Sequence, residues 1–213
     1  MGVISLHIHQ LRVNRRGVVK ENEAMADIDR ERWDARWREA GPKAPSSFLV
    51  SLDASLPRAG RALDVAGGPG HDALWLAARG LAVTLVDVSP VALGRARAEA
   101  ARRHLALETV ERDLERLGLP DGPFDVVVCL NYLERALFPR FEEVLAEGGL
   151  LLFAQPTRTN LERHSRPSAR FLLEPGELRT LVPPGLTVVS LEEGWTEEGR
   201  HEARLVARRP RAH

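Results

Sequence analysis

The chain has 213 residues, which fits one domain of ordinary size. Hydrophobic residues make up 44% of it and charged residues 28%, and the 30 basic and 30 acidic side chains cancel to a net charge of zero. This balance is typical of a globular chain with a closed core; it argues against nucleic acid as a partner, which calls for a basic excess, and the short apolar runs argue against a membrane span.

The chain begins with a segment unlike the rest. Residues 1–24 hold a short, interrupted apolar stretch followed by a basic one, an order that is wrong for a secretory leader. We interpret residues 1–24 as a disordered tail or a mis-assigned start, and residues 25–213 as a single domain. The one cysteine, Cys129, cannot form an internal disulfide, which suits a reducing compartment, so we expect a cytoplasmic protein.

Helical and extended patterns alternate over the rest of the chain. The predicted helices are Asp27–Ala40, Phe48–Leu56, His71–Arg79, Val91–His104 and Leu133–Ala146, and the predicted strands are Arg61–Val65, Ala82–Val86, Leu107–Glu111, Phe124–Leu130, Leu150–Gln155, Leu186–Leu191 and Glu202–Ala207. Strands that alternate with helices and are apolar on both faces predict a doubly wound α/β fold, in which helices cover both faces of a mostly parallel sheet. The last two strands form a hairpin, which makes the final strand antiparallel to its neighbours.

A glycine-rich turn follows the first predicted strand, in the run Asp64-Val-Ala-Gly-Gly-Pro-Gly70. Glycines let a ligand approach the backbone amides closely, and ligands of open α/β sheets bind beyond the carboxyl ends of the strands. Asp64, just before the turn, could hold an ammonium group. The alternative is a tight turn that binds nothing.

Two more acids follow the next two strands. Asp87 could accept both hydroxyls of a ribose, or it could serve as a capping acid for the helix after Ser89. Asp113 could accept from an adenine amine, or it could belong to a solvated face together with Glu111 and Glu115. Because three carboxylates at successive strand ends flank one glycine turn, the pattern predicts a ligand that contains adenosine.

Two such ligands compete, S-adenosylmethionine (SAM) and a dinucleotide such as NAD. NAD sites prefer the spacing G-x-G-x-x-G and place a diphosphate at the turn. Here the glycines are closer together, and Asp64 would face a diphosphate unfavourably. An acid beside the turn suits the amino group of a methionine, and the terminal hairpin also favours SAM.

The run Leu63–Ala77 resembles motif I of the class I SAM-dependent methyltransferases. Asp87, Arg112–Leu114 and Phe124–Leu130 resemble the later motifs of that family in order and spacing. The resemblance implies a seven-stranded sheet of order 3-2-1-4-5-7-6 and methyl transfer from SAM, with the methionine held by the glycine turn, the ribose by Asp87 and the adenine after the third strand. The implied cofactor-binding residues are Asp64, Ala66, Gly67, Gly68, Gly70, Asp87, Val88, Asp113, Leu114, Asn131 and Trp37.

Within the class, Arg32–Trp37 and Leu172–Leu178 are most similar to the small tellurite-resistance and thiopurine-type branch. The family usually has glycine at the position of Ala66, so we expect slightly weaker or shifted contact with SAM there. Trp33 and Trp37 could close the first helix over the cofactor, because an aromatic face attracts a sulfonium, or they could merely anchor that helix.

The methyl acceptor is expected to approach from the ends of the fourth and fifth strands. The candidates on that side are Asn131, Tyr132, Arg135, Gln155, Thr157, His164 and Arg166. Residues 158–170 look like a mobile loop whose arginines attract an anionic acceptor, or else only confer surface solubility.

Methyl transfer from a sulfonium needs alignment more than it needs a base, so the missing catalytic dyad is no objection. We therefore expect transfer to a small molecule such as a thiol or a metalloid oxyanion. The alternatives are an NAD-type oxidoreductase and a non-catalytic SAM-binding protein of the same fold. No metal is expected, because no cluster has ligand spacing, and the sequence does not indicate an oligomeric state.

Overall fold

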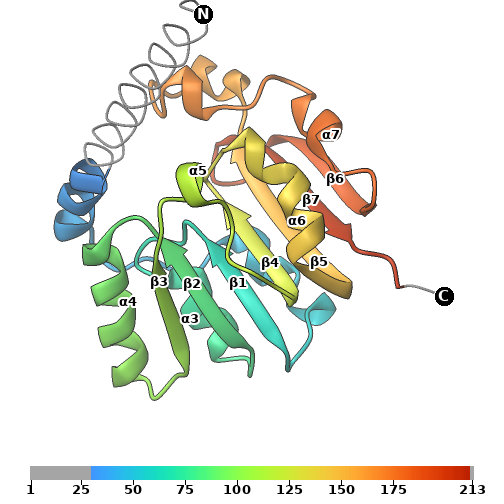
Figure 1. The fold of residues 1–213 in the computed structure, drawn as a ribbon. Helices are drawn as coiled ribbons and strands as arrows, with labels where there is room; N and C mark the ends of the chain where they lie inside the picture. Colours follow the sequence, from blue (N-terminus) through green and yellow to red (C-terminus); the bar gives the residue numbers. More distant parts are fainter. Residues whose placement is uncertain (1–29, 212–213) are drawn as a thin grey trace, which may run out of the picture.

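The computed structural model describes residues 30–211, so the segment interpreted as a tail or mis-assigned start lies outside the described residues. Seven strands form one sheet in the order β3-β2-β1-β4-β5-β7-β6 (Figure 1). The first five strands are parallel, and β7 runs antiparallel between β5 and β6. The doubly wound fold and the strand order expected from the sequence are confirmed.

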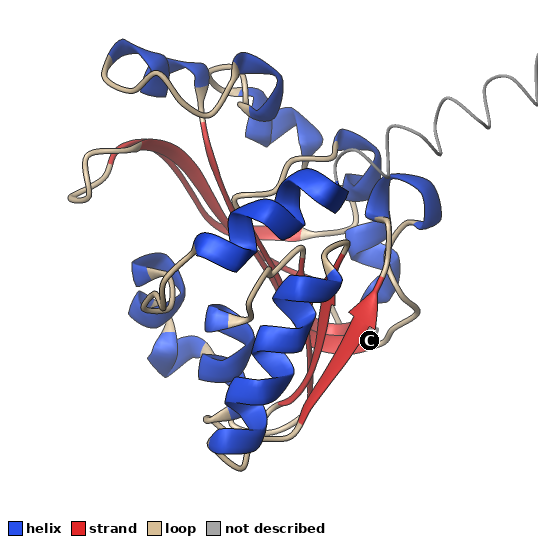
Figure 2. Ribbon diagram, turned by 90° about the vertical axis from the view of Figure 1, so that its left-hand side faces the viewer, coloured by secondary structure: helices blue, strands red, loops and turns tan. Residues whose placement is uncertain are grey.

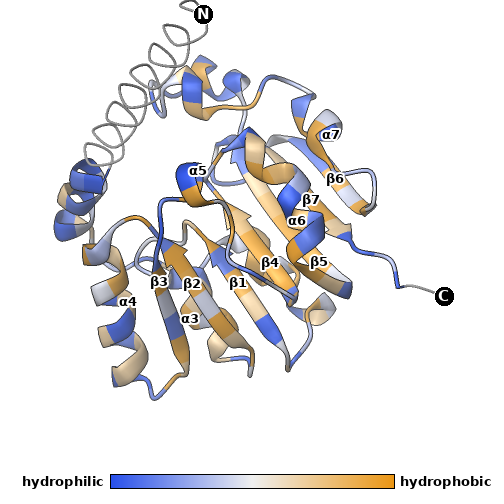
Figure 3. Cartoon of the chain, in the orientation of Figure 1, coloured by the Kyte–Doolittle hydropathy of each residue, from blue (hydrophilic) through white to orange (hydrophobic). Residues whose placement is uncertain are grey.

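The most apolar strands lie at the centre of the sheet, where both of their faces are covered (Figure 3). In β1 and β4, successive side chains enter the two opposite core clusters, as the twofold alternation of a strand requires. The strands are β1 Arg61–Val65, β2 Ala82–Asp87, β3 Leu107–Glu111, β4 Phe124–Leu130, β5 Leu145–Pro156, β6 Thr187–Trp195 and β7 His201–Arg208.

Helices bury apolar side chains against each face, so the sheet is the middle of three layers (Figure 2). One face is covered by α2 Ser47–Ser51, α3 His71–Ala77 and α4 Pro90–Arg102. The other face is covered by α5 Leu114–Leu117, α6 Phe138–Val144 and α7 Glu177–Leu181. A further helix over residues 30–39 precedes α2 and is called the N-terminal helix below.

Two predicted helices are wrong in extent. The helix predicted over Phe48–Leu56 is the single turn α2 followed by a 3-10 turn at Asp53–Ser55. The helix predicted over Leu133–Ala146 begins as a 3-10 turn and ends at Val144, because Leu145 already pairs with Phe124 in the sheet. The residues between Leu145 and Leu150 form a bulge, in which Gly148 takes a φ of 78°.

Two short helices escaped the sequence patterns. α5 is a single turn capped by Asp113, and α7 begins after Gly176, whose φ is 77°. Neither is long enough to show apolar residues at helical spacing. Both lie at or near the carboxyl edge of the parallel strands, together with the N-terminal helix and the segment that follows β5 (Figure 1). That edge contains the candidate site.

Candidate functional site

The glycine turn is built around the buried carboxylate of Asp64. The side chain is 2% exposed, and its Oδ2 accepts a hydrogen bond of 3.0 Å from the amide of Ala73 in α3. A Cβ atom on Gly67 would lie 2.3 Å from that same oxygen, so only glycine fits there. Burial raises the pKa of Asp64 well above its ordinary value, and the nearby charges of Asp72 and Asp87 raise it further.

Asp87 joins the glycine turn to the start of α4. Its Oδ2 accepts from the amide of Gly68 at 2.8 Å, and its Oδ1 accepts from the amide of Ser89 at 2.8 Å. Ser89 is itself the N-cap of α4 and accepts from Ala92 at 3.1 Å. Asp87 therefore holds the backbone before α4 in place, which agrees with the structural role considered for it beside ribose binding. Each of its oxygens has a second lone pair for a ligand hydroxyl, so the ribose interpretation also stays open.

Val88 lies between Asp87 and Ser89 and is half-buried at the carboxyl edge of the sheet. The ends of β2 and β3 are tied together beside it by a backbone hydrogen bond of 3.0 Å from Arg112 to Asp87. This bond brings the next acid, Asp113, to the same edge of the sheet.

Asp113 is the N-cap of α5 and is partly exposed, between the exposed Glu111 and Glu115. Its Oδ1 accepts from the amides of Glu115 and Arg116 at 3.1 and 3.3 Å, which starts α5. Leu114 follows it and is buried in the core. Asp64, Asp87 and Asp113 thus lie at or just beyond the carboxyl ends of three neighbouring strands.

Ala66 occupies a backbone position that favours glycine. Its φ is 52°, in the left-handed region, where a side chain costs about 1–2 kcal/mol. Gly68 and Gly70 follow it with φ of 56° and 76°. The departure from the family pattern therefore carries strain, which the surrounding turn tolerates.

The N-terminal helix lies against the glycine turn. A Cβ on Gly68 would meet the ring of Trp37 at 2.8 Å, so this ring faces the turn directly. Trp33 stacks on Trp37 with a centroid distance of 6.0 Å. Asp34 accepts from the Ser89 hydroxyl, and Arg95 of α4 donates to the backbone oxygen of Trp37.

Trp37 thus lies against the glycine turn, and Trp33 stacks on Trp37. Closure over the cofactor and anchoring of the helix both stay predictions for these residues.

Asn131 is an exposed residue at the end of β4, with a φ of 60°. Its Oδ1 accepts from Arg200 at 2.5 Å. Arg200 precedes β7, and it also pairs with Glu202, which is buried. Tyr132, the next residue after Asn131, is half-buried, and burial beside several acids raises its pKa.

Arg135 forms an ion pair with Glu177 of α7. Its Nε and Nη2 donate to the carboxylate of Glu177 at 2.6 and 2.8 Å. This two-point pair connects the segment after β4 to α7, and the acceptor-side role of Arg135 stays a prediction.

The segment after β5 folds onto the β6–β7 turn. The Nε2 of His164 shares a hydrogen bond of 2.7 Å with the backbone oxygen of Gly199, and Arg166 is exposed. The hydroxyl of Thr157 shares one of 2.7 Å with His201, and the side-chain amide of Gln155 donates to the backbone oxygen of Phe171. The expected loop therefore has specific docking contacts, and His164 uses its ring for one of them.

Within the described residues, three buried side-chain polar atoms lack a hydrogen-bond partner: His71 Nε2, Gln155 Oε1 and Arg200 Nε. Such atoms are rare in folded proteins and call for a partner. His71 follows the glycine turn, Gln155 is near the end of β5, and Arg200 precedes β7, so all three come from the carboxyl edge of the sheet.

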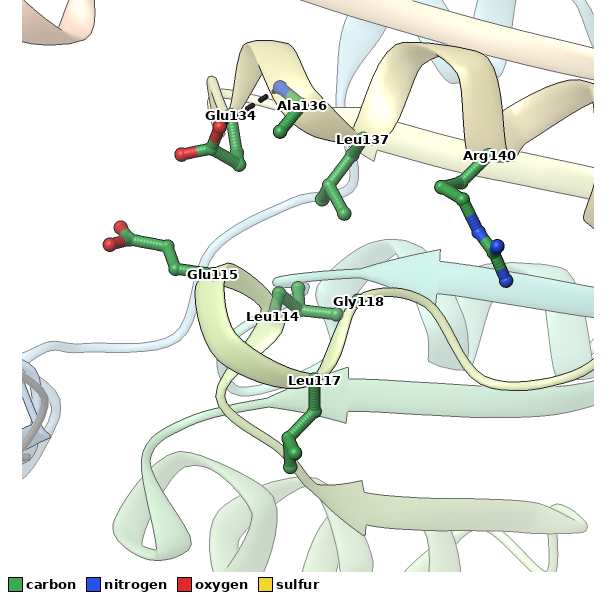
Figure 4. A pocket seen from close by; sticks show the side chains of 8 residues that line it. All are labelled: Leu114, Glu115, Leu117, Gly118, Glu134, Ala136, Leu137 and Arg140. Atoms are coloured by element: carbon green, nitrogen blue, oxygen red, sulfur yellow. Dashed lines mark hydrogen bonds between the residues drawn. The ribbon is translucent and has the colours of Figure 1, made fainter. Parts of the chain in front are cut away.

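A cavity of about 320 Å³ opens between α5 and the start of α6 (Figure 4). Leu114 is the one predicted cofactor residue that lines it, and the carboxylates of Glu115 and Glu134 lie at one side of it. This cavity borders the expected adenine position but does not include the glycine turn. In residues 30–211 there is no cluster of histidine, cysteine or acidic side chains that could hold a metal ion. No helix in that range is long and apolar enough to cross a membrane.

Sequence reasoning missed Asp34, Arg95 and Arg200. The topology contained a signal for Arg200, since the first residues of an antiparallel strand lie at the carboxyl edge of its parallel neighbours. Asp34 and Arg95 depend on how two helices dock, and no local pattern marks that contact.

Comparison with known proteins finds similarity to methyltransferases. Residues 62–149 match a family model described as a methyltransferase domain. The putative methyltransferase YqeM of Bacillus subtilis is 36% identical over 111 residues, which cover 48% of this chain and 44% of that protein. The ribosomal protein L11 methyltransferase of Thermus thermophilus is 35% identical over 127 residues, which cover 58% of this chain and 50% of that protein. The chain spans about half the length of these curated relatives.

Solved structures share the fold. Magnesium protoporphyrin IX methyltransferase (ChlM) from Synechocystis with bound S-adenosylhomocysteine (SAH) superimposes with a TM-score of 0.66 at 19% identity, covering 86% of this chain and 99% of that one. TehB from Haemophilus influenzae gives a TM-score of 0.67 at 17% identity, covering 81% of this chain and 65% of that one. At these identities the likeness establishes the fold alone.

The strand order is that of a methyltransferase fold, and residues 62–149, which include the glycine turn and its neighbouring acids, are similar to a methyltransferase domain.

The site fits SAM chemically. The turn has no room for a side chain at Gly67, Asp64 and Asp87 place carboxylates beside it, and the unpaired Nε2 of His71 lies at its end.

Proposed function

We propose that this chain transfers the methyl group of SAM to a small-molecule acceptor. The observation that carries the proposal is the hydrogen bond of 2.8 Å between the Gly68 amide and Asp87, which unites the glycine turn and the second acid in one rigid unit. When bound, SAM supplies an electrophilic methyl group on a sulfonium. Asp64 would receive its amino group, Asp87 its ribose hydroxyls, and Asp113 with Leu114 its adenine.

The protein's part in the reaction is to align the acceptor and to exclude water. Cys129 and Tyr132, at and just after the end of β4, are poor bases near neutral pH. Burial raises the pKa of Cys129, and burial with neighbouring acids raises that of Tyr132, so both stay protonated near neutral pH. This supports acceptors that attack without losing a proton in the transition state, such as thiolates and metalloid oxyanions.

Arg200 supports an anionic acceptor more directly than His164 or Arg166 does. It touches Asn131 at the end of β4 and keeps an unpaired buried Nε. Glu202 offsets part of its charge, so the guanidinium would act mainly through directed hydrogen bonds. The narrower likeness to tellurite-resistance and thiopurine-type enzymes rests on Arg32–Trp37 and Leu172–Leu178, and it points to the same acceptor chemistry.

Two rival functions make different predictions. An NAD-type oxidoreductase would place a diphosphate beside Asp64, which is unfavourable for two like charges in a buried site. A non-catalytic binder of the same fold would bind SAM without turnover. The fold by itself does not establish methyl transfer, because one structural neighbour with a TM-score of 0.63 at 19% identity is described as the cyclase SpnF.

The test is transfer of labelled methyl groups from SAM to a panel of thiols, thiopurines and metalloid oxyanions. The proposal predicts transfer to at least one anionic acceptor, and loss of that transfer in the Asp87→Asn variant. SAM binding without transfer to any acceptor would favour the non-catalytic rival.

A further inference from the structure

Arg200 lies in the turn between β6 and β7, and the chain after β5 binds this turn on both sides of the arginine. Before Arg200, the backbone oxygen of Gly199 accepts a hydrogen bond of 2.7 Å from the Nε2 of His164. After Arg200, the amide of His201 donates to the Oδ1 of Asn160 at 3.2 Å. The backbone on either side of Arg200 is therefore fixed by side chains of one neighbouring segment.

That segment, residues 157–171, is called the post-β5 segment below, and Asn160 is at its centre. The Asn160 side chain is 2% exposed, and its Nδ2 donates to the backbone oxygen of Arg166 at 3.3 Å. Because a backbone oxygen can only accept, this bond settles which end of the amide faces which partner. Asn160 therefore binds its own segment with the nitrogen and the amide of His201 with the oxygen.

Ring contacts complete the interface between the post-β5 segment and the β6–β7 hairpin. The guanidinium of Arg163 lies 3.8 Å from the ring centroid of Trp195 in β6, and the Trp195 ring meets that of His201 edge to face at 5.2 Å. The amide of Thr157 donates to the backbone oxygen of His201 at 3.0 Å, and the Thr157 hydroxyl shares a hydrogen bond of 2.7 Å with the His201 ring. The segment and the hairpin thus form one packed unit.

The guanidinium of Arg200 reaches from this unit to the end of β4. It donates to the Oδ1 of Asn131 at 2.5 Å and pairs with the buried Glu202, and its Nε is shielded from solvent without a partner. A long side chain directs a hydrogen bond at a ligand only when its backbone and its neighbours hold it in place. The contacts on both sides of Arg200 supply that constraint.

We propose that His164 and Asn160 are positioning residues, which fix the backbone around Arg200 and so direct its guanidinium at an anionic methyl acceptor. The inference rests on the proposed function and deepens it. His164 then acts through Arg200 and does not touch the acceptor itself. A segment that only stabilised the hairpin would make the same contacts, so the test has to measure selectivity for charge and not activity or stability alone.

The test compares two thiols that differ in charge, 3-mercaptopropionate and 3-mercaptopropionamide. Calorimetric titration of the SAH-saturated chain gives the ratio of their dissociation constants, which we expect to favour the carboxylate by about tenfold in the wild type. His164→Ala should reduce that preference by about two- to tenfold, the effect of one hydrogen bond. His164→Gln keeps a donor for the oxygen of Gly199 and should retain most of the preference.

Three further variants separate positioning from bracing. Asn160→Ala should also reduce the preference, and the exposed His164 keeps the test open if the variant of the buried Asn160 does not fold. In an Arg200→Gln background, His164→Ala should change the ratio no further, because its effect acts through the guanidinium. Glu174→Gln is the matched control: it breaks the ion pair of 2.6 Å with Arg158, which ties the post-β5 segment to the residues before α7, and it should leave the ratio unchanged.

A carboxylate preference that survives both His164→Ala and Asn160→Ala would overturn the inference. Equal weakening of the two thiols would also overturn it, since that is the result expected of a segment that only stabilises the hairpin. A wild-type chain that binds SAH and shows no preference for the carboxylate would contradict the inference as well. A chain that does not bind SAH would instead contradict the proposed function.

Discussion

Replacing Gly67 with alanine tests the glycine turn where it has the least space. The new Cβ would lie 2.3 Å from Asp64 Oδ2 and 2.5 Å from Leu85 Cδ1, both of them buried. Moving Asp64 aside would cost its hydrogen bond to Ala73, worth about 1 kcal/mol, and crowding the core costs about 1–3 kcal/mol more. The Gly67→Ala variant should therefore lose about 2–4 kcal/mol of unfolding free energy.

For a domain of this size, that loss corresponds to a melting temperature lower by roughly 4–16 °C. Gly94→Ala in α4 is the control, because nothing lies within 4 Å of its Cβ position. It should raise stability by about 0.8–1 kcal/mol through helix propensity alone. Thermal unfolding followed by circular dichroism gives both shifts, and calorimetry gives the affinity for SAH, which should fall only in the Gly67 variant. A Gly67→Ala variant that melts and binds SAH like the wild type would refute the packing argument.

Asp87→Asn should weaken SAH binding by about 1.5–3 kcal/mol, because a neutral amide replaces a charged acceptor of the ribose hydroxyls; calorimetry measures this, and an unchanged affinity would remove Asp87 from the site. Burial raises the pKa of Asp64 in the folded chain above its unfolded pKa of 3.8. The stability that the protonated carboxyl gives to the ligand-free fold is therefore fully present below pH 3.8, and it is lost as the pH rises through the raised folded pKa. Urea unfolding should therefore show Asp64→Asn gaining stability relative to the wild type as the pH increases, and a difference that shrank with rising pH would contradict the sign. Arg135→Gln breaks a pair whose arginine side chain is 44% exposed, so it should cost less than about 1 kcal/mol in thermal unfolding and leave SAH affinity unchanged; a large loss of affinity would return Arg135 to the ligand site.

The strand order and the glycine turn could be predicted because their signals are local and repeated. Apolar segments such as Phe124–Leu130 alternate with helical ones, and that alternation constrains parallel topology. Asp87 could be placed for the same reason, since the end of a buried strand fixes which edge of the sheet it reaches. Its contact with Gly68 then follows from the pairing of β1 with β2.

Element lengths and long-range partners could not be predicted. The predicted helix over Leu133–Ala146 is too long because pairing of Leu145 with Phe124 outweighs local helical preference. The ion pair of Arg135 with Glu177 could not be predicted, since the two residues are 42 positions apart in the sequence. The roles of Arg95 and Arg200 depend on helix docking and on the register between β5 and β7, which short-range patterns do not encode.

The most direct test of the central claim is calorimetric titration of the purified chain with SAH and, separately, with NAD. The account predicts a saturable SAH isotherm that is weakened at least tenfold by Asp87→Asn, and no heat of binding with NAD. Saturable NAD binding without a response to SAH would contradict the assignment of the glycine turn and its three acids to SAM.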